Sequence, residues 1–116
     1  MAFTFTNVTN DPVTGLQTIT ATVDTNSAAG TFYIGFKPRY IVVYQETTPA
    51  QYEWVEGMTA AYMKKTIANG TMTQETSNGI TVVATTSVTA GQGPWAVTLG
   101  TGCHTNSAAF RILCFR

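Results

Sequence analysis

The residues best suited to catalysis are the single histidine, His104, and the two cysteines, Cys103 and Cys114. A cysteine paired with a histidine suggests nucleophilic catalysis, in which the imidazole removes the thiol proton. However, Cys103 and His104 are adjacent in a loop-like stretch, adjacent residues on a strand point to opposite faces, and no third group is evident to orient the imidazole. Their spacing also matches no zinc site, and a fourth ligand is missing. We therefore expect neither a catalytic nor a metal site here, and no cofactor.

Carboxylates offer the other common route to catalysis, because a pair of them can act as general acid and general base. Glu53 and Glu56 form a candidate pair. A spacing of three along a strand would place their side chains on opposite faces, where they cannot act on one substrate atom. The sequence also contains no glycine-rich loop of the kind that binds phosphate. We therefore expect that the protein is not an enzyme.

The composition predicts a β-rich protein whose surface carries hydroxyl groups more than charges. The chain has 116 residues, of which 23 are threonine and only 10% are charged. Threonine is branched at Cβ, which favours strands over helices. The formal net charge is zero and the six Lys and Arg residues are scattered, so we do not expect nucleic-acid binding. A surface with so few charges suits a protein held permanently in an assembly.

The length is typical of one domain, and we expect a single domain over residues 1–116. The first residues include no basic region followed by an apolar run, so neither a signal peptide nor a membrane span is expected. Synthesis should therefore take place in the cytoplasm. Because no export signal is evident, Cys103 and Cys114 are expected to be free thiols rather than a disulfide.

Residues 31–44 form the strongest β-type stretch, in which two runs are joined at Pro38 as a hairpin or a corner. The first run alternates, and the second is apolar on both faces, which is typical of a central strand covered on both sides. Lys37 and Arg39 flank the proline and are candidate contacts for a partner, although two solvated charges at a bend would look the same. Alternation predicts these core residues: Phe32, Ile34, Phe36, Val42 and Ile112.

The rest of the chain reads as short strands separated by turns. Residues 2–9 and 16–24 are expected to pair, and residues 60–68 are interpreted as a strand rather than a helix. Asn69-Gly70 and Asn78-Gly79 each indicate a hairpin, with a short polar edge strand between them. The last strand, residues 108–116, should be central or buried in an interface. Eight or nine strands at this spacing predict an all-β fold, a β-sandwich of jelly-roll type, with a small closed β-barrel as the alternative.

Aromatic residues raise a second class of function. Tyr52, Trp54, Tyr62 and Trp95 would make a platform for sugar rings if they are exposed, as in a carbohydrate-binding module. Aromatic residues of a small sandwich also serve as core residues or as anchors of an interface. Tyr52 and Trp54, together with Lys37 and Arg39, are our candidate residues for contact with a partner.

Four motifs carry a resemblance to a known class of proteins. They are Gly-Phe-Lys-Pro-Arg at 35–39, Trp-Val-Glu-Gly-Met at 54–58, Asn-Gly-Ile-Thr-Val at 78–82 and the closing Phe-Arg-Ile-Leu-Cys-Phe-Arg at 110–116. With them the chain resembles small virion proteins of tailed bacteriophages, which are capsid decoration (cement) proteins or components of head or tail fibres. The resemblance covers about residues 34–116 and leaves residues 1–30 outside.

The resemblance implies an all-β protein without catalysis that acts by binding the shell or the tail as an oligomer. A chain of this length lacks the long repetitive shaft of a complete fibre, which favours decoration over the fibre alternative. The expected partners are the major capsid protein and further copies of the chain, as a homotrimer, with no nucleic acid and no membrane. The expected location is the virion, on the capsid surface.

Overall fold

Antiparallel strands make up almost all of the regular structure. The computed structural model describes residues 3–6, 16–23, 28–46, 49–67, 69–85, 94–103 and 108–116. Within these ranges one short 3-10 helix, η1 (Thr101–Cys103), accompanies ten strands: β1 (Phe3–Thr6), β2 (Leu16–Val23), β3 (Gly30–Ile34), β4 (Tyr40–Gln45), β5 (Ala50–Val55), β6 (Met63–Thr66), β7 (Met72–Glu75), β8 (Ile80–Ala84), β9 (Trp95–Leu99) and β10 (Ala109–Phe115). The predicted all-β class is confirmed, and residues 63–66 form the expected strand rather than a helix.

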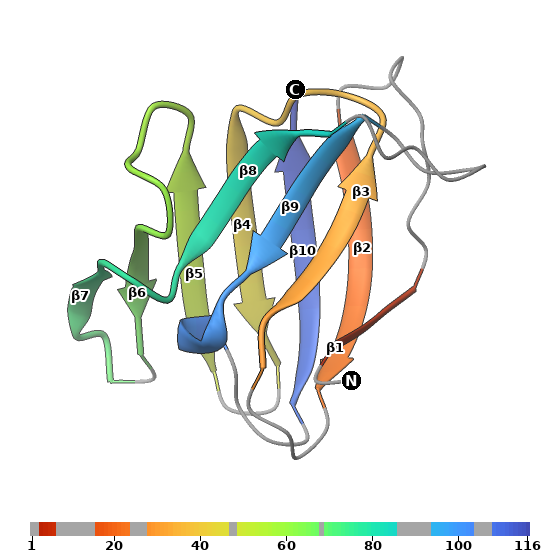
Figure 1. Cartoon of the computed structure of the whole chain (residues 1–116). Helices are drawn as coiled ribbons and strands as arrows, with labels where there is room; N and C mark the ends of the chain where they lie inside the picture. The colour runs from red at the N-terminus through yellow and green to blue at the C-terminus, as the bar shows by residue number, and fades with distance from the viewer. Residues whose placement is uncertain are drawn as a thin grey trace.

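The strands form two sheets that lie one in front of the other (Figure 1). The larger sheet has seven strands in the order β1-β2-β10-β4-β5-β6-β7, and the smaller has three in the order β3-β9-β8. Every pair is antiparallel, and the expected pairing of β1 with β2 is confirmed. The predicted β-sandwich is therefore confirmed, and the described strands do not close into the alternative barrel. The seven-plus-three division is less even than the eight strands of a typical jelly roll.

The stretch around Pro38 is a corner between the two sheets, not a hairpin. β3 belongs to the smaller sheet and β4 to the larger one, so the chain changes layers between Ile34 and Tyr40. Pro38 is buried at this change. β3 has already ended at Ile34, and Pro38, which has no amide hydrogen for a strand ladder, keeps the residues before Tyr40 out of either sheet.

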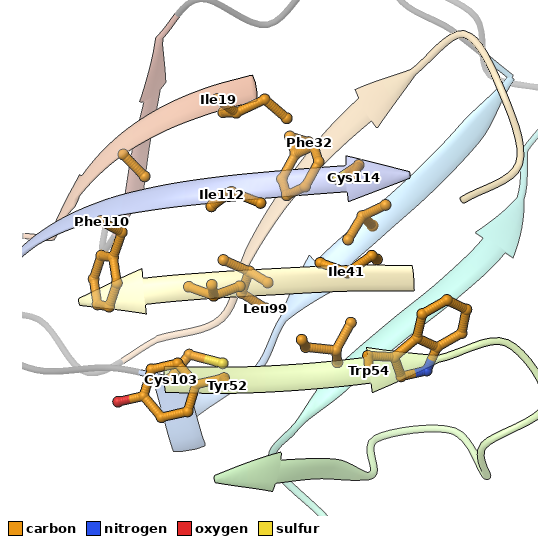
Figure 2. Close-up of a cluster of buried hydrophobic side chains, with 14 of the residues drawn as sticks. Ile19, Phe32, Ile41, Tyr52, Trp54, Leu99, Cys103, Phe110, Ile112 and Cys114 are labelled. Atoms are coloured by element: carbon orange, nitrogen blue, oxygen red, sulfur yellow. The ribbon is translucent and has the colours of Figure 1, made fainter. Parts of the chain in front are cut away.

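The core lies between the two sheets, and its side chains come from the strands in which apolar and polar residues alternate most clearly (Figure 2). β10 lies between β2 and β4 in the middle of the larger sheet, as its apolar sequence predicted. Its side chains alternate between buried and less buried positions, because only one face meets the smaller sheet. All five predicted core residues are buried: Phe32, Ile34, Phe36, Val42 and Ile112. Val42, however, lies on the face of β4 that points away from the smaller sheet, outside the core between the sheets.

The two Asn-Gly pairs have different roles. Asn69-Gly70 joins β6 to β7 as a hairpin, with Gly70 at a φ of 87°, so that prediction is confirmed. The hairpin predicted at Asn78-Gly79 is wrong, because β7 and β8 lie in different sheets. Glycine is needed at 79 for another reason: a Cβ there would lie 2.6 Å from the carbonyl oxygen of Ala61, to which the Gly79 N–H donates. This close approach holds the chain where it passes from one sheet to the other.

Candidate interaction surface

The thiols that suggested nucleophilic catalysis are buried in the core. Cys103 is fully buried in η1, where its Sγ lies 3.4 Å from the Sδ of Met63, and Cys114 is fully buried on β10. Both are free, as expected. Burial raises the pKa of each thiol to about 12, so both stay protonated at neutral pH and are poor nucleophiles. His104 lies outside the described residues.

The two carboxylates considered as an acid and base pair interact with different partners. Glu53 is half-buried on β5 and accepts hydrogen bonds from two neighbouring side chains. Glu56 lies in the turn after β5 and forms an ion pair with Lys37, with 3.2 Å between Nζ and Oε2. Among the described residues no three His, Cys, Asp or Glu side chains gather in a way that would hold a metal ion.

Tyr52 and Trp54 are core residues, which corrects their prediction as partner contacts. They have exposed fractions of 2% and 6%, and Figure 2 shows both on β5 among the buried side chains. The Tyr52 hydroxyl donates to Oε1 of buried Gln45 at 3.0 Å, which satisfies its polar group inside the sandwich. Tyr62 and Trp95 are half-buried. The four aromatic residues therefore do not form the exposed sugar platform considered from the sequence.

Lys37 and Arg39 are exposed at the corner, where a partner could reach them. The Lys37 ammonium lies 5.5 Å from the centre of the Trp95 ring and also pairs with Glu56. The backbone around Arg39 ties three strands together: its N–H donates to Phe115 at 2.7 Å, and its carbonyl accepts from Glu56 at 2.8 Å. We call the group formed by Lys37, Arg39, Glu56 and Trp95 the corner cluster.

These backbone bonds bring together three of the four motif segments identified in the sequence. The corner consists of residues 35–39. The end of β5 and the turn after it consist of residues 54–58. The chain segment 110–116 reaches the corner at Phe115, whose carbonyl accepts from the Arg39 N–H. The turn is held by the N–H of Val55, which donates to the Met58 Sδ at 3.2 Å. The fourth segment, residues 78–82, lies at the passage from β7 to β8 and bonds instead to Ala61 and to Gly100.

The larger sheet has a second face, on the side away from the smaller sheet, which we call the outer face. No described strand packs over it. Residues directly opposite one another in antiparallel strands point to the same side, so the strand register defines its rows. Across β10, β4, β5, β6 and β7, these rows are Phe115-Tyr40-Val55, then Leu113-Val42-Glu53-Lys64-Gln74, and then Arg111-Tyr44-Gln51-Thr66-Met72.

Apolar side chains are exposed along this outer face. Tyr44, Val55 and Met72 have exposed fractions of 46%, 50% and 59%, and they come from three different strands. Tyr40, Leu113 and Phe115 are half-buried beside them. A groove of about 490 Å³ runs over the β5 to β7 part of the face, lined by Glu53, Val55, Met58, Lys64, Met72, Thr73 and Gln74. Exposed apolar groups gathered on one side of a domain are typical of a binding surface.

The carboxylate of Glu53 interacts with three polar side chains of the outer face. Oε2 of Glu53 accepts a hydrogen bond of 2.8 Å from the Tyr40 hydroxyl, and its Oε1 accepts one of 3.0 Å from Nε2 of Gln51. Lys64 Nζ is 4.0 Å from the same Oε1. The hydrogen bond to Glu53, and then burial, raise the pKa of Tyr40. The polar groups at the centre of the face are thus largely paired with one another, which lowers the cost of removing water from it.

The sequence indicated this surface only in outline. Alternation put Tyr40 and Tyr44 on one face of their strand and Phe115 on one face of another strand, but both strands were expected to be covered, and nothing in the sequence paired them. Val55 and Met72 were not predicted as surface residues, because their places in the rows of Tyr40 and Tyr44 depend on the register of three strand pairs. The described chain includes no helix that is long and apolar enough to cross a membrane. No protein-family model, no curated protein and no solved structure matches the chain.

Proposed function

We propose that the protein is a non-enzymatic virion structural protein that binds the outside of a bacteriophage head and stabilises it as a decoration (cement) protein. Its partner would be the major capsid protein, and its location the capsid surface after synthesis in the bacterial host. The observation that carries the proposal is the outer face, where apolar side chains of β4, β5 and β7 are exposed on a domain with 10% charged residues. The resemblance of the four motifs to phage virion proteins supports the same class.

The outer face has the chemistry of an interface centre, and the corner cluster has the chemistry of its rim. Tyr44 and Tyr40 supply the aromatic area that is typical of an interface centre, and the charged Glu53 between them has partners in Tyr40, Gln51 and Lys64. Arg39 and Lys37 lie at the end of the sheet next to Tyr40 and Phe115. There they would donate charge-assisted hydrogen bonds to carboxylates of the coat. The aromatic anchors are therefore Tyr40 and Tyr44 in place of the buried Tyr52 and Trp54.

Such a surface strengthens a shell without catalysis. A domain that contacts neighbouring coat subunits adds its own binding free energy to the contacts that must break before the shell opens. Its effect therefore requires only binding to the assembled head, and no cofactor.

The direct test is to mix the purified protein with undecorated mature heads and, separately, with isolated tails, and to measure the amount that co-sediments. We expect saturable, stoichiometric binding to heads. Two matched variants locate the surface, because Val55 and Val83 are the same residue type with the same exposed fraction of 50% in different sheets. Val55→Glu places a charge on the outer face and should weaken binding by about tenfold or more. Val83→Glu, on β8, should bind like the wild type.

Two results would contradict the proposal. Binding to tails or fibres but not to heads would replace decoration with the fibre function that the sequence left as the alternative. Full binding by Val55→Glu together with loss of binding by Val83→Glu would move the contact surface from the outer face to the smaller sheet.

A further inference from the structure

β7 is exposed in a way that no other described strand is. It forms the end of the larger sheet, at the far left of Figure 1, and pairs only with β6. Met72, Thr73 and Gln74 are all exposed, so both faces of the strand and its free edge meet solvent. β8 also ends a sheet, but it buries Ile80 in the core. A four-residue strand that buries so little gains little stability from its own sheet.

The free edge of β7 also lacks the usual protection against pairing. Natural edge strands carry lysine, proline or a bulge that discourages another strand from adding to them. The strand reads Met-Thr-Gln-Glu, and Glu75 is its only charge. Its edge is therefore open to strand addition, in which a partner strand hydrogen-bonds to the exposed backbone groups.

The hairpin bonds show which backbone groups are available. The N–H of Ile67 donates to the carbonyl of Thr71, so Ile67 and Thr71 form a hydrogen-bonded pair. Hydrogen-bonded and non-hydrogen-bonded pairs alternate along an antiparallel ladder. Thr73 and Glu75 therefore direct their N–H and carbonyl groups toward β6, whereas Met72 and Gln74 direct theirs to the open edge.

We propose that β7 pairs with β7 of a second copy of the chain, antiparallel and about a two-fold axis at Thr73, which joins the two larger sheets into one. In this register Met72 faces Gln74 of the second copy, and the two residues exchange both of their backbone hydrogen bonds on each side of the axis. Thr73 faces Thr73 of the second copy, and Thr-Thr pairs are favourable cross-strand neighbours. No two like charges lie opposite each other, because Glu75 faces Thr71.

The self-complementary sequence is the reason to choose a second copy over another partner. A two-fold contact requires the same patch to fit itself, and Met-Thr-Gln centred on Thr73 does so without an unpaired charge. The pairing also brings the outer faces of the two copies to the same side of one continuous sheet, since the axis is perpendicular to the sheet. The resulting unit is a dimer, which differs from the trimer expected from the sequence. This inference does not depend on head binding.

A cysteine at the axis tests the register. Residues opposite each other in a non-hydrogen-bonded pair have Cα atoms about 4.5 Å apart, which is within the range of a disulfide. Thr73→Cys should therefore form a covalent dimer under mild oxidation. In the same register the two copies of residue 74 are offset along the strands, with Cα atoms about 9 Å apart, which is too far for a disulfide. Gln74→Cys is the matched control and should form covalent dimer at least about tenfold more slowly. The native thiols do not interfere, because both are buried.

A proline at the edge tests whether the backbone bonds hold the contact. Gln74→Pro removes an N–H that points away from β6, so the hairpin keeps its own bonds while the Met72 carbonyl of the second copy loses its donor. We expect this variant to sediment as a monomer at concentrations where the wild type is a dimer, and Thr73→Cys to lose its cross-linking when combined with it. The proposal is overturned if Thr73→Cys and Gln74→Cys cross-link at equal rates, or if folded Gln74→Pro remains a dimer. The comparison of the two cysteines decides the matter even if the proline variant does not fold.

Discussion

Truncation of Ile34 measures how well the two sheets are packed together. Ile34 ends β3, opposite Trp95 in the register, and has an exposed fraction of 0% within the core. Ile34→Ala removes three carbon groups, which are worth about 2.4 kcal/mol at about 0.8 kcal/mol for each buried group. The space left behind adds a cavity cost, so we expect the free energy of unfolding to fall by about 3 to 4 kcal/mol.

Urea unfolding, followed by tryptophan fluorescence, checks this value. The midpoint should fall at an unchanged m-value, because the mutation changes stability and not the surface exposed on unfolding. Val83→Ala is the control on β8, where half of the side chain is already exposed, and it should cost less than about 1 kcal/mol. A loss below about 0.5 kcal/mol for Ile34→Ala, or a loss equal to that of Val83→Ala, would refute the packing of β3 described above.

Three further predictions concern the thiols and one glycine. Cys103 and Cys114 should resist alkylation in the native protein and both react in denaturant, as followed by mass spectrometry; fast reaction of either in the folded state would contradict its burial. The folded state raises the pKa of each thiol from 9.0 to about 12, so it holds protons that the unfolded chain releases. The two thiols therefore contribute fully to the free energy of unfolding below about pH 9, and this contribution is lost as the pH rises toward 12. Cys114→Ala should make the fall of the free energy of unfolding with pH less steep, and an equally steep fall would contradict the prediction. Gly79→Ala should lower the free energy of unfolding by about 1 to 3 kcal/mol, because its Cβ would meet the Ala61 carbonyl, and no loss would show that the passage between sheets has room.

The sequence predicted most reliably the strands that bury one face against a sheet. On β10 the apolar sequence correctly predicted a strand in the middle of a sheet and the burial of Ile112, but Leu113 and Phe115 make the opposite face apolar as well, so the sequence did not show that only one face meets the smaller sheet. Pro38 likewise predicted an interruption, because proline has no amide hydrogen for a strand ladder.

Features that depend on distant contacts were not predictable in this way. Asn78-Gly79 resembles a hairpin turn, but glycine is required there by the approach of the Ala61 carbonyl, from a segment that the dipeptide does not specify. Alternation placed Tyr52 and Trp54 on one face of β5, but it cannot tell which face the smaller sheet covers. The short polar edge strand expected between the two Asn-Gly pairs is β7, but that it pairs with β6 and not with β8 follows from the strand order, which the local sequence does not contain.

The temperature at which heads release their DNA tests most directly whether the outer face stabilises a head. Undecorated heads are heated alone, with the wild-type protein, with the Val55→Glu variant and with the Val83→Glu variant, and DNA release is followed with an intercalating dye. We predict that the wild-type protein raises the release temperature, that Val83→Glu raises it equally, and that Val55→Glu at the same concentration raises it much less. An unchanged release temperature with saturating wild-type protein would contradict the claim.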